Sequence, residues 1–233
     1  MKPDPYPLLL KPAYKNYLWG GTRIAEVYGR ETPPGPVAES WEVSTRPEGM
    51  SLVLNGPLAG RTLQEAIDTM GEDLLGARAP RGQMPLLIKL IDARDRLSVQ
   101  VHPDDESAAL HGGEAKTEMW ILLDAEPGAC LFAGFRPGLA RPEIEQAIRE
   151  GRWTEILQTL PVRAGDAVFI PGGRVHAIGA GCLILEIQQN SNTTYRLYDW
   201  DRKGSDGKPR KLHLEQALSV IRWEDPGEPL LQP

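Results

Sequence analysis

Residues Leu97 to Glu118 read LSVQVHPDDESAALHGGEAKTE, and the beginning of this stretch decides the fold. Apolar and polar residues alternate there, which is the pattern of a half-buried β-strand. Gln100 and His102 therefore lie on the same face of the strand, opposite its apolar side chains. A carboxamide beside an imidazole needs either solvent or a common polar partner, and a metal ion is one such partner.

Two further candidate ligands stand where other strands begin. Glu118 precedes the apolar run MWILL at 119–123. His176 follows GDAVFIPGGRV at 165–175, in which a strand meets a Pro-Gly-Gly turn before the next strand starts. The strand edges thus offer four ligands to one divalent ion: Gln100, His102, Glu118 and His176.

The spacing around the last of these ligands is specific. Gly165, Pro171, Gly173 and His176 have the spacing of the second cupin motif. The first cupin motif usually supplies two histidines and a nearby glutamate. Here glutamine replaces the first histidine, and the glutamate follows the remaining histidine after an inserted segment.

That departure, followed by HPDD and KTEMW, resembles the type I mannose 6-phosphate isomerases (phosphomannose isomerases) in their short bacterial form. The resemblance extends over most of the chain. It includes AESWEVS at 38–44, PLLIKLIDA at 85–93 and NSNTTYRLYDWDRK at 190–203.

The resemblance implies a zinc-dependent enzyme, with one zinc per chain, that interconverts mannose 6-phosphate and fructose 6-phosphate through an enediol. It implies an active-site role for Arg196, and Lys116 as an acid, a base or a phosphate contact. Many relatives have an aspartate where this chain has Asn192, which cannot accept a proton at neutral pH. We therefore expect that Asn192 orients the substrate, or that a carboxylate such as Glu186 or Asp199 contacts the substrate and takes part in proton transfer.

Two other function classes remain compatible with the four ligands. Two imidazoles and one carboxylate also serve non-haem iron oxygenases, so the ligand types alone do not identify the metal. A non-catalytic sugar-binding cupin would keep the pocket without needing Lys116 or Arg196. Metal analysis and an isomerase assay distinguish these possibilities.

The fold class that we predict is all-β, a cupin double-stranded β-helix (jelly-roll) barrel with short peripheral helices. Twenty-one prolines and twenty-four glycines favour short strands and turns. We expect one domain over residues 1–233. It comprises an N-terminal extension at 1–84, the metal-binding barrel core at 85–205, and a C-terminal helix and tail at 206–233.

Composition limits the partners of the chain. The formal net charge is −6, which argues against nucleic acid, and no apolar run is long enough to span a membrane. With no export signal, we expect a cytoplasmic enzyme that binds a small sugar phosphate, and the sequence leaves its oligomeric state open. Cys130 and Cys182 lie in apolar runs and are expected to be buried free thiols.

Several local predictions bear on the site. Glu39 and Glu42 lie on opposite faces of one strand, so either one faces the site or, more simply, both are edge-strand charges. Lys89, in an otherwise apolar strand, is either a buried ion-pair partner or a phosphate-facing cation. Helices are expected at residues 62–75, with a Thr-x-x-Glu capping box, and at 103–110, 142–150, 153–160 and 214–221.

Overall fold

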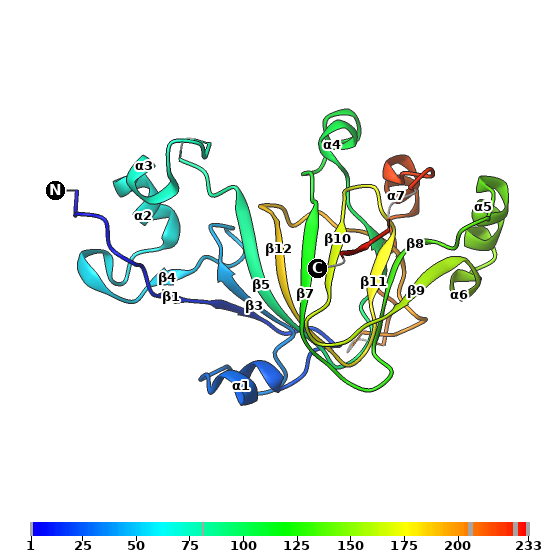
Figure 1. Ribbon diagram of the computed structural model, residues 1–233, viewed down its shortest axis with the longest axis horizontal. Coiled ribbons are helices and arrows are strands. Elements are labelled where there is room, and N and C mark those ends of the chain that lie inside the picture. The colour runs from blue at the N-terminus through cyan, green and yellow to red at the C-terminus, as the bar shows by residue number, and fades with distance from the viewer. Residues whose placement is uncertain (1, 81, 205–206, 226–227, 232–233) are drawn as a thin grey trace.

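The computed structural model describes residues 2–80, 82–204, 207–225 and 228–231. Most strands belong to two antiparallel sheets (Figure 1). The larger sheet has seven strands, in the order β14 (Leu230–Leu231), β10 (Ala167–Ile170), β7 (Glu118–Ala125), β12 (Cys182–Gln189), β5 (Leu86–Ala93), β3 (Glu39–Val43) and β2 (Ala13–Lys15). The smaller has five, in the order β13 (Tyr195–Tyr198), β6 (Val99–Val101), β11 (His176–Ile178), β8 (Cys130–Phe135) and β9 (Leu157–Pro161).

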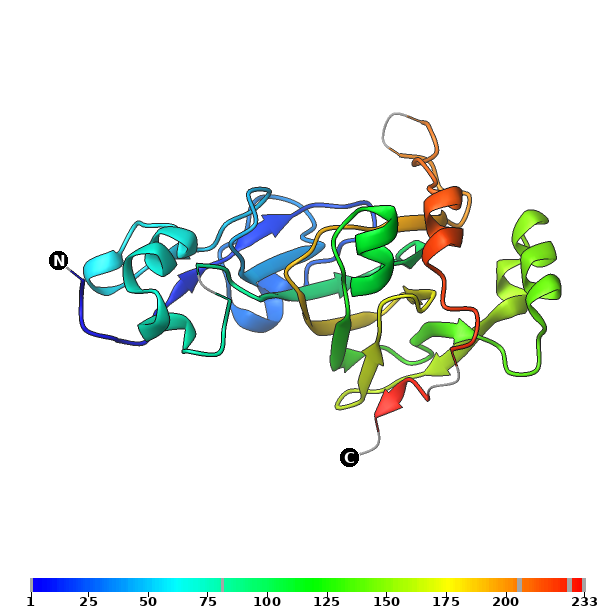
Figure 2. The same cartoon turned by 90° about the horizontal axis from the view of Figure 1, so that it is seen from above.

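The helices are short and lie outside the sheets. Helices α2 and α3 stand at the end near the N-terminus, and α5 and α6 stand at the opposite end (Figures 1 and 2). The helices are α1 (Arg23–Tyr28), α2 (Leu63–Met70), α3 (Glu72–Leu75), α4 (Asp105–His111), α5 (Arg141–Arg149), α6 (Trp153–Ile156) and α7 (Leu214–Val220), with one 3-10 turn, η1 (Gly56–Leu58). A separate pair, β1 (Leu10–Lys11) and β4 (Leu52–Val53), completes the elements.

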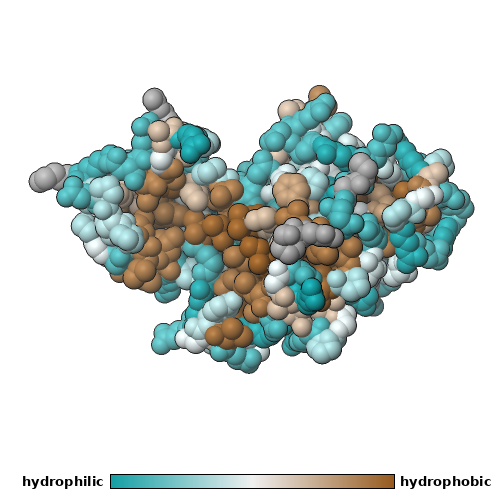
Figure 3. Space-filling view, viewed as in Figure 1, coloured by the Kyte–Doolittle hydropathy of each residue, from teal (hydrophilic) through white to brown (hydrophobic). Residues whose placement is uncertain are grey.

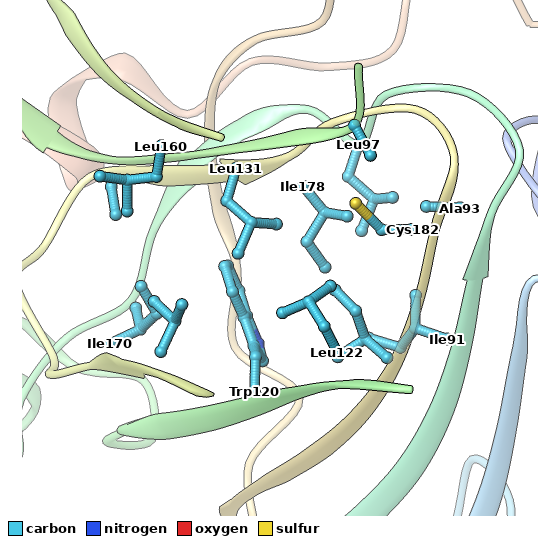
Figure 4. Close-up of a cluster of buried hydrophobic side chains, with 14 of the residues drawn as sticks. Ile91, Ala93, Leu97, Trp120, Leu122, Leu131, Leu160, Ile170, Ile178 and Cys182 are labelled. Atoms are coloured by element: carbon cyan, nitrogen blue, oxygen red, sulfur yellow. The ribbon is translucent and has the colours of Figure 1, made fainter. Parts of the chain in front are cut away.

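The main core lies between the two sheets. Trp120 and Leu122 on β7 meet Leu131 on β8 and Ile178 on β11 (Figure 4). Because side chains alternate along a strand, the neighbouring residues of β7 point outward: Met119 and Ile121 are half-buried, and Leu123 is exposed. Apolar side chains accordingly gather over the outer face of the larger sheet (Figure 3).

The mostly-β prediction is confirmed, but the strands do not close into a barrel. Among the described residues, no strand of the seven-stranded sheet pairs with a strand of the five-stranded sheet. Strands β2 and β3 from the N-terminal part extend the larger sheet beyond β5. The division into one domain with boundaries near residues 84 and 205 stays a prediction.

Two predicted helices need correction. The helix at 62–75 does begin at Thr62 with the predicted capping box, but it breaks at Gly71, whose φ of 58° only glycine adopts readily. The helix at 153–160 ends at Ile156, and the chain continues as β9, paired with β8. Apolar residues at this spacing fit a helix or a strand, so the available pairing partner decided between them.

Several other predictions agree with the structure. Helices α4, α5 and α7 lie within two residues of the ranges that the sequence predicted at each end. Both cysteines are free, with Cys182 buried and Cys130 half-buried. No helix in the described parts of the chain combines the length and apolarity required to cross a membrane.

Candidate metal centre and active-site cavity

The structure brings three of the predicted ligands together in the interior. One ligand atom from each of His102, Glu118 and His176 lies within 4.8 Å of the others. The Glu118 carboxylate stands between the imidazoles, with Oε1 at 3.4 Å from His102 Nε2 and Oε2 at 3.8 Å from His176 Nε2. All three side chains are about 1% exposed. Distant segments thus meet in one site that offers two nitrogen ligands and one carboxylate.

Gln100 is the fourth predicted ligand, and strand pairing aligns it with the others. It lies opposite His176 on β11 and opposite Arg196 on β13. Its Nε2 is 3.3 Å from His176 Nε2. Carboxamide oxygen and nitrogen exchange places by a half-turn of the amide, so Gln100 can present its oxygen at the same point.

The protonation states suit metal ligands. Burial and the nearby Lys116 ammonium lower the pKa of His102 to about 3, and burial lowers the pKa of His176. Burial alone would raise the pKa of Glu118, but Lys116 and His102 hold it well below its usual range. Neutral imidazoles beside an ionised carboxylate are the forms that bind a divalent cation.

Unpartnered atoms support the same conclusion. Glu118 Oε2 makes no hydrogen bond within the described chain, nor does the buried Nδ1 of His102, whereas Glu118 Oε1 pairs with Lys116. His176 Nδ1 donates to the backbone oxygen of Arg174 at 2.9 Å. That bond places the hydrogen on Nδ1 and leaves the Nε2 lone pair directed at Glu118. The donor set therefore fits zinc, which proteins commonly bind through imidazole nitrogen and carboxylate oxygen.

Lys116 reaches the same centre. Its Nζ lies 2.6 Å from Glu118 Oε1 and 3.2 Å from His102 Nε2, and its side chain is 6% exposed. Residues two apart on an extended chain share a face, so the Lys116 side chain points to the same side as Glu118. The lysine also lines a cavity together with Gln100, the fourth predicted ligand.

That cavity has a volume of about 230 Å³ and carries several charges. The polar residues that line it include Lys89, Gln100, Lys116, Glu186, Arg196 and Arg210. The Lys89 ammonium pairs with Glu186 at 3.0 Å. Glu186 Oε1 also accepts a hydrogen bond from Trp120 Nε1. Lys89 is thus a buried ion-pair partner that also lines the cavity, and its role as a phosphate-facing cation stays a prediction.

Arg196 faces the cavity without a carboxylate partner. Its Nε donates to Ser98 Oγ at 3.2 Å and its Nη1 to the backbone oxygen of Lys211 at 3.0 Å. Within the described residues, no carboxylate lies within ion-pairing distance of this guanidinium. Burial and the neighbouring Arg210 lower its pKa, yet an arginine stays charged. It therefore has donors available for an anionic ligand.

Asp199 and Asn192, which the sequence also singled out, lie differently. Asp199 is not among the cavity-lining residues and instead accepts hydrogen bonds from Arg202 and Arg210. Asn192 lines the cavity, where its Nδ2 is 3.4 Å from Glu48 Oε1 and its backbone N–H donates to Glu114. An aspartate at 192 would face these two carboxylates, so the uncharged asparagine suits its surroundings.

Sequence reasoning assigned no firm role to two further cavity residues. Glu39 was interpreted mainly as an edge charge, but its strand β3 lies between β2 and β5 and is not an edge strand. Glu39 lines the cavity, and Glu42 pairs with Arg30 on the opposite face of the strand. Arg210 was not singled out from the sequence, and its pairing with Asp199 holds it at the cavity. No local signal marks that contact.

Comparisons with known proteins agree with this geometry. Residues 8–127 match the family model of the phosphomannose isomerase type I catalytic domain. The chain is 44% identical to a probable mannose-6-phosphate isomerase, GmuF, of Bacillus subtilis, over 93% of this chain and 68% of the relative. It is 42% identical to a mannose-6-phosphate isomerase of Streptococcus mutans, over 92% and 67%. The crystal structure of a Bacillus subtilis mannose 6-phosphate isomerase superposes with a TM-score of 0.87 at 36% identity, covering 94% of this chain and 69% of that one.

Proposed function

The chain belongs to the type I phosphomannose isomerase family, and on that premise we propose that it interconverts mannose 6-phosphate and fructose 6-phosphate with one zinc ion per chain. We also assign its two facing sheets to the cupin class and the enzyme to the cytoplasm. The observation that carries the proposal is the meeting of two features at one cavity. Lys116 contacts the buried group of His102, Glu118 and His176, and it lines the same cavity as Gln100 and Arg196.

Gln100, His102, Glu118 and His176 would hold the metal, because they combine neutral nitrogen ligands, a carboxylate and a carboxamide within one site. Zinc supplies positive charge to a sugar carbonyl or hydroxyl oxygen when it is bound. The chain's own residues supply the remaining electrostatics of the cavity.

The reaction moves a proton between adjacent carbons through an enediol, so it needs an acid–base group and charge complementary to the developing oxyanion. We assign Lys116 to this step, because Nζ lies 2.6 Å from Glu118 Oε1 and the side chain lines the cavity. It can steady an enediolate oxygen or transfer the proton.

Arg196 and Glu186 complete the assignment. The Arg196 guanidinium presents a planar fork to an enediolate or phosphate oxygen, and no carboxylate in the described chain competes for it at ion-pairing distance. We assign Glu186 to accept hydrogen bonds from sugar hydroxyl groups at the cavity wall. Asp199 acts indirectly, by holding Arg210 at the cavity.

The test is a coupled assay that converts mannose 6-phosphate into fructose 6-phosphate, run on purified protein with its metal content measured. We expect turnover that disappears on chelation and returns with zinc, and loss of both metal and turnover in His176→Ala. Iron without isomerisation would favour an oxygenase instead. Sugar binding without turnover would favour a non-catalytic binding protein.

A further inference from the structure

The loop at residues 171–175, which joins β10 to β11, touches the segments that carry the other metal ligands. Gly173 N–H donates to the backbone oxygen of His102 at 2.7 Å. Gly172 N–H donates to Oγ1 of Thr117, the neighbour of Glu118, at 3.2 Å. His176 follows the loop directly. The position of this loop therefore sets the relative positions of all three ligands in the buried group.

The loop is packed tightly on two sides. A Cβ at Gly172 would lie 2.6 Å from Asp104 Cα, and one at Gly173 would lie 2.9 Å from Arg222 Cβ. Gly173 also has a φ of 87°, which disfavours other residues. Paired glycines leave the free chain many conformations, so neighbouring contacts must select one of them. The C-terminal segment at residues 221–225 supplies these contacts on one side.

Two contacts join the C-terminal segment to the loop. Arg222 N–H donates to the backbone oxygen of Gly173 at 2.8 Å. The Asp225 carboxylate receives two hydrogen bonds from the Arg174 guanidinium, 2.5 Å from Nε and 2.8 Å from Nη2. Arg174 Nη1 donates in addition to the backbone oxygen of Phe169 on β10. Such a paired fork fixes direction as well as distance.

Arg174 connects this clamp to a ligand. Its backbone oxygen accepts the hydrogen bond of His176 Nδ1 at 2.9 Å. Its own side chain is 4% exposed, and that of Asp225 is 11% exposed. Solvent therefore screens the ion pair little, and a shift of Arg174 would turn the His176 imidazole.

We propose that Asp225 is a positioning residue for metal binding, acting through Arg174 on the orientation of His176. The inference rests on the proposed function, because it takes His176 as a metal ligand. It adds that a residue of the C-terminal segment, outside the metal-binding strands, sets the affinity of the site. Partners of ligating histidines change metal affinity about 10- to 100-fold when removed.

The test compares the zinc dissociation constant of the full chain with that of single variants, by competition with a chelator at neutral pH. Asp225→Asn keeps the shape and removes the charge, and Asp225→Glu restores the charge. Asp92→Asn is the matched control, because Asp92 also accepts two hydrogen bonds from one arginine, Arg23, while being 1% exposed. Thermal unfolding of the metal-free proteins is measured in parallel.

We expect Asp225→Asn to raise the zinc dissociation constant about tenfold, and Asp225→Glu to recover most of that loss. Asp92→Asn should lower the melting temperature and leave zinc affinity at the parent value. Unchanged affinity in Asp225→Asn would overturn the inference, as would equal losses in Asp225→Asn and Asp92→Asn.

If Asp225→Asn does not fold, Arg174→Lys takes its place, because lysine keeps the charge without the planar fork. Unchanged zinc affinity in Arg174→Lys, or a loss equal to that in Asp92→Asn, would then overturn the inference. A parent protein that binds no zinc would instead refute the metal assignment of the proposed function, which separates that failure from the failure of the positioning role.

Discussion

Lys89 on β5 and Glu186 on β12 lie directly opposite each other in the larger sheet, and Lys89 Nζ is 3.0 Å from Glu186 Oε2. Both side chains are nearly inaccessible to solvent. Burial alone would lower the pKa of Lys89, but Glu186 and Glu39 raise it above its ordinary value. Burial and the Glu118 carboxylate raise the pKa of Glu186. The pair places two opposite charges in the wall of the cavity.

Lys89→Met should destabilise the protein by about 3–5 kcal/mol, because it leaves the buried Glu186 carboxylate without its cation. The double variant Lys89→Met, Glu186→Gln should be more stable than the single variant, since neither charge remains uncompensated. Urea unfolding of the four proteins in this cycle measures the coupling. Strictly additive losses would show that the pair contributes no coupling energy.

Arg196→Ala should reduce turnover about 10²- to 10³-fold, the loss typical of removing one donor that stabilises transition-state charge. Metal content and melting temperature should stay near the parent values, because this arginine holds no carboxylate in the described structure. Arg202→Ala is the matched control. It loses the ion pairs to Asp199 and Asp95 and should show its effect in the melting temperature. An unfolded or metal-free Arg196→Ala protein would make Arg196 structural.

Lys116→Met distinguishes proton transfer from phosphate binding. If Lys116 acts in the transition state, kcat and kcat/KM should fall together, by about 10²- to 10⁴-fold. We expect this result because Nζ contacts Glu118 and His102, two of the proposed metal ligands. Steady-state kinetics with mannose 6-phosphate make the measurement, and exposed Lys11→Met serves as the control. An unchanged kcat with a raised KM would move Lys116 to phosphate binding.

Asp199→Asn should lower stability by about 1–3 kcal/mol at neutral pH. Burial would raise the pKa of Asp199, but hydrogen bonds from Arg210 and Arg202 hold it below its ordinary value. A carboxyl whose pKa is depressed by folding stabilises the protein above its unfolded pKa of about 3.9, and that contribution is lost as pH falls through the folded pKa.

The melting-temperature difference between the parent and Asp199→Asn should therefore be full at pH 7 and pH 5 and shrink below about pH 4. Asp68→Asn, at an exposed position, should show little difference at any of these pH values. A difference for Asp199→Asn that persists undiminished at the lowest pH would contradict the ion-pair explanation.

The sequence by itself determined those features that depend on neighbouring residues. Alternation along 97–102 placed Gln100 and His102 on one face, and the structure has them there, next to His176. Glu118 and His176 open β7 and β11 as the turn signals predicted. The capping box at Thr62 and the start of α4 after Asp104 also follow from local hydrogen bonding. The spacing from Gly165 to His176 indicated the cupin motif, and the glutamine at position 100, followed by HPDD and KTEMW, carried the family resemblance.

Tertiary structure alone decided where these local pieces meet. Residues 157–161 became a strand because β8 offered a partner, and in the described residues the strands of the predicted jelly-roll barrel form two sheets that do not pair with each other. Arg210 reached the cavity through Asp199, and Asp225 reached Arg174 across 51 residues of sequence. Pairing between distant segments is set by burial of the whole chain and by the need of each buried charge for a partner, and neither is encoded within a short stretch.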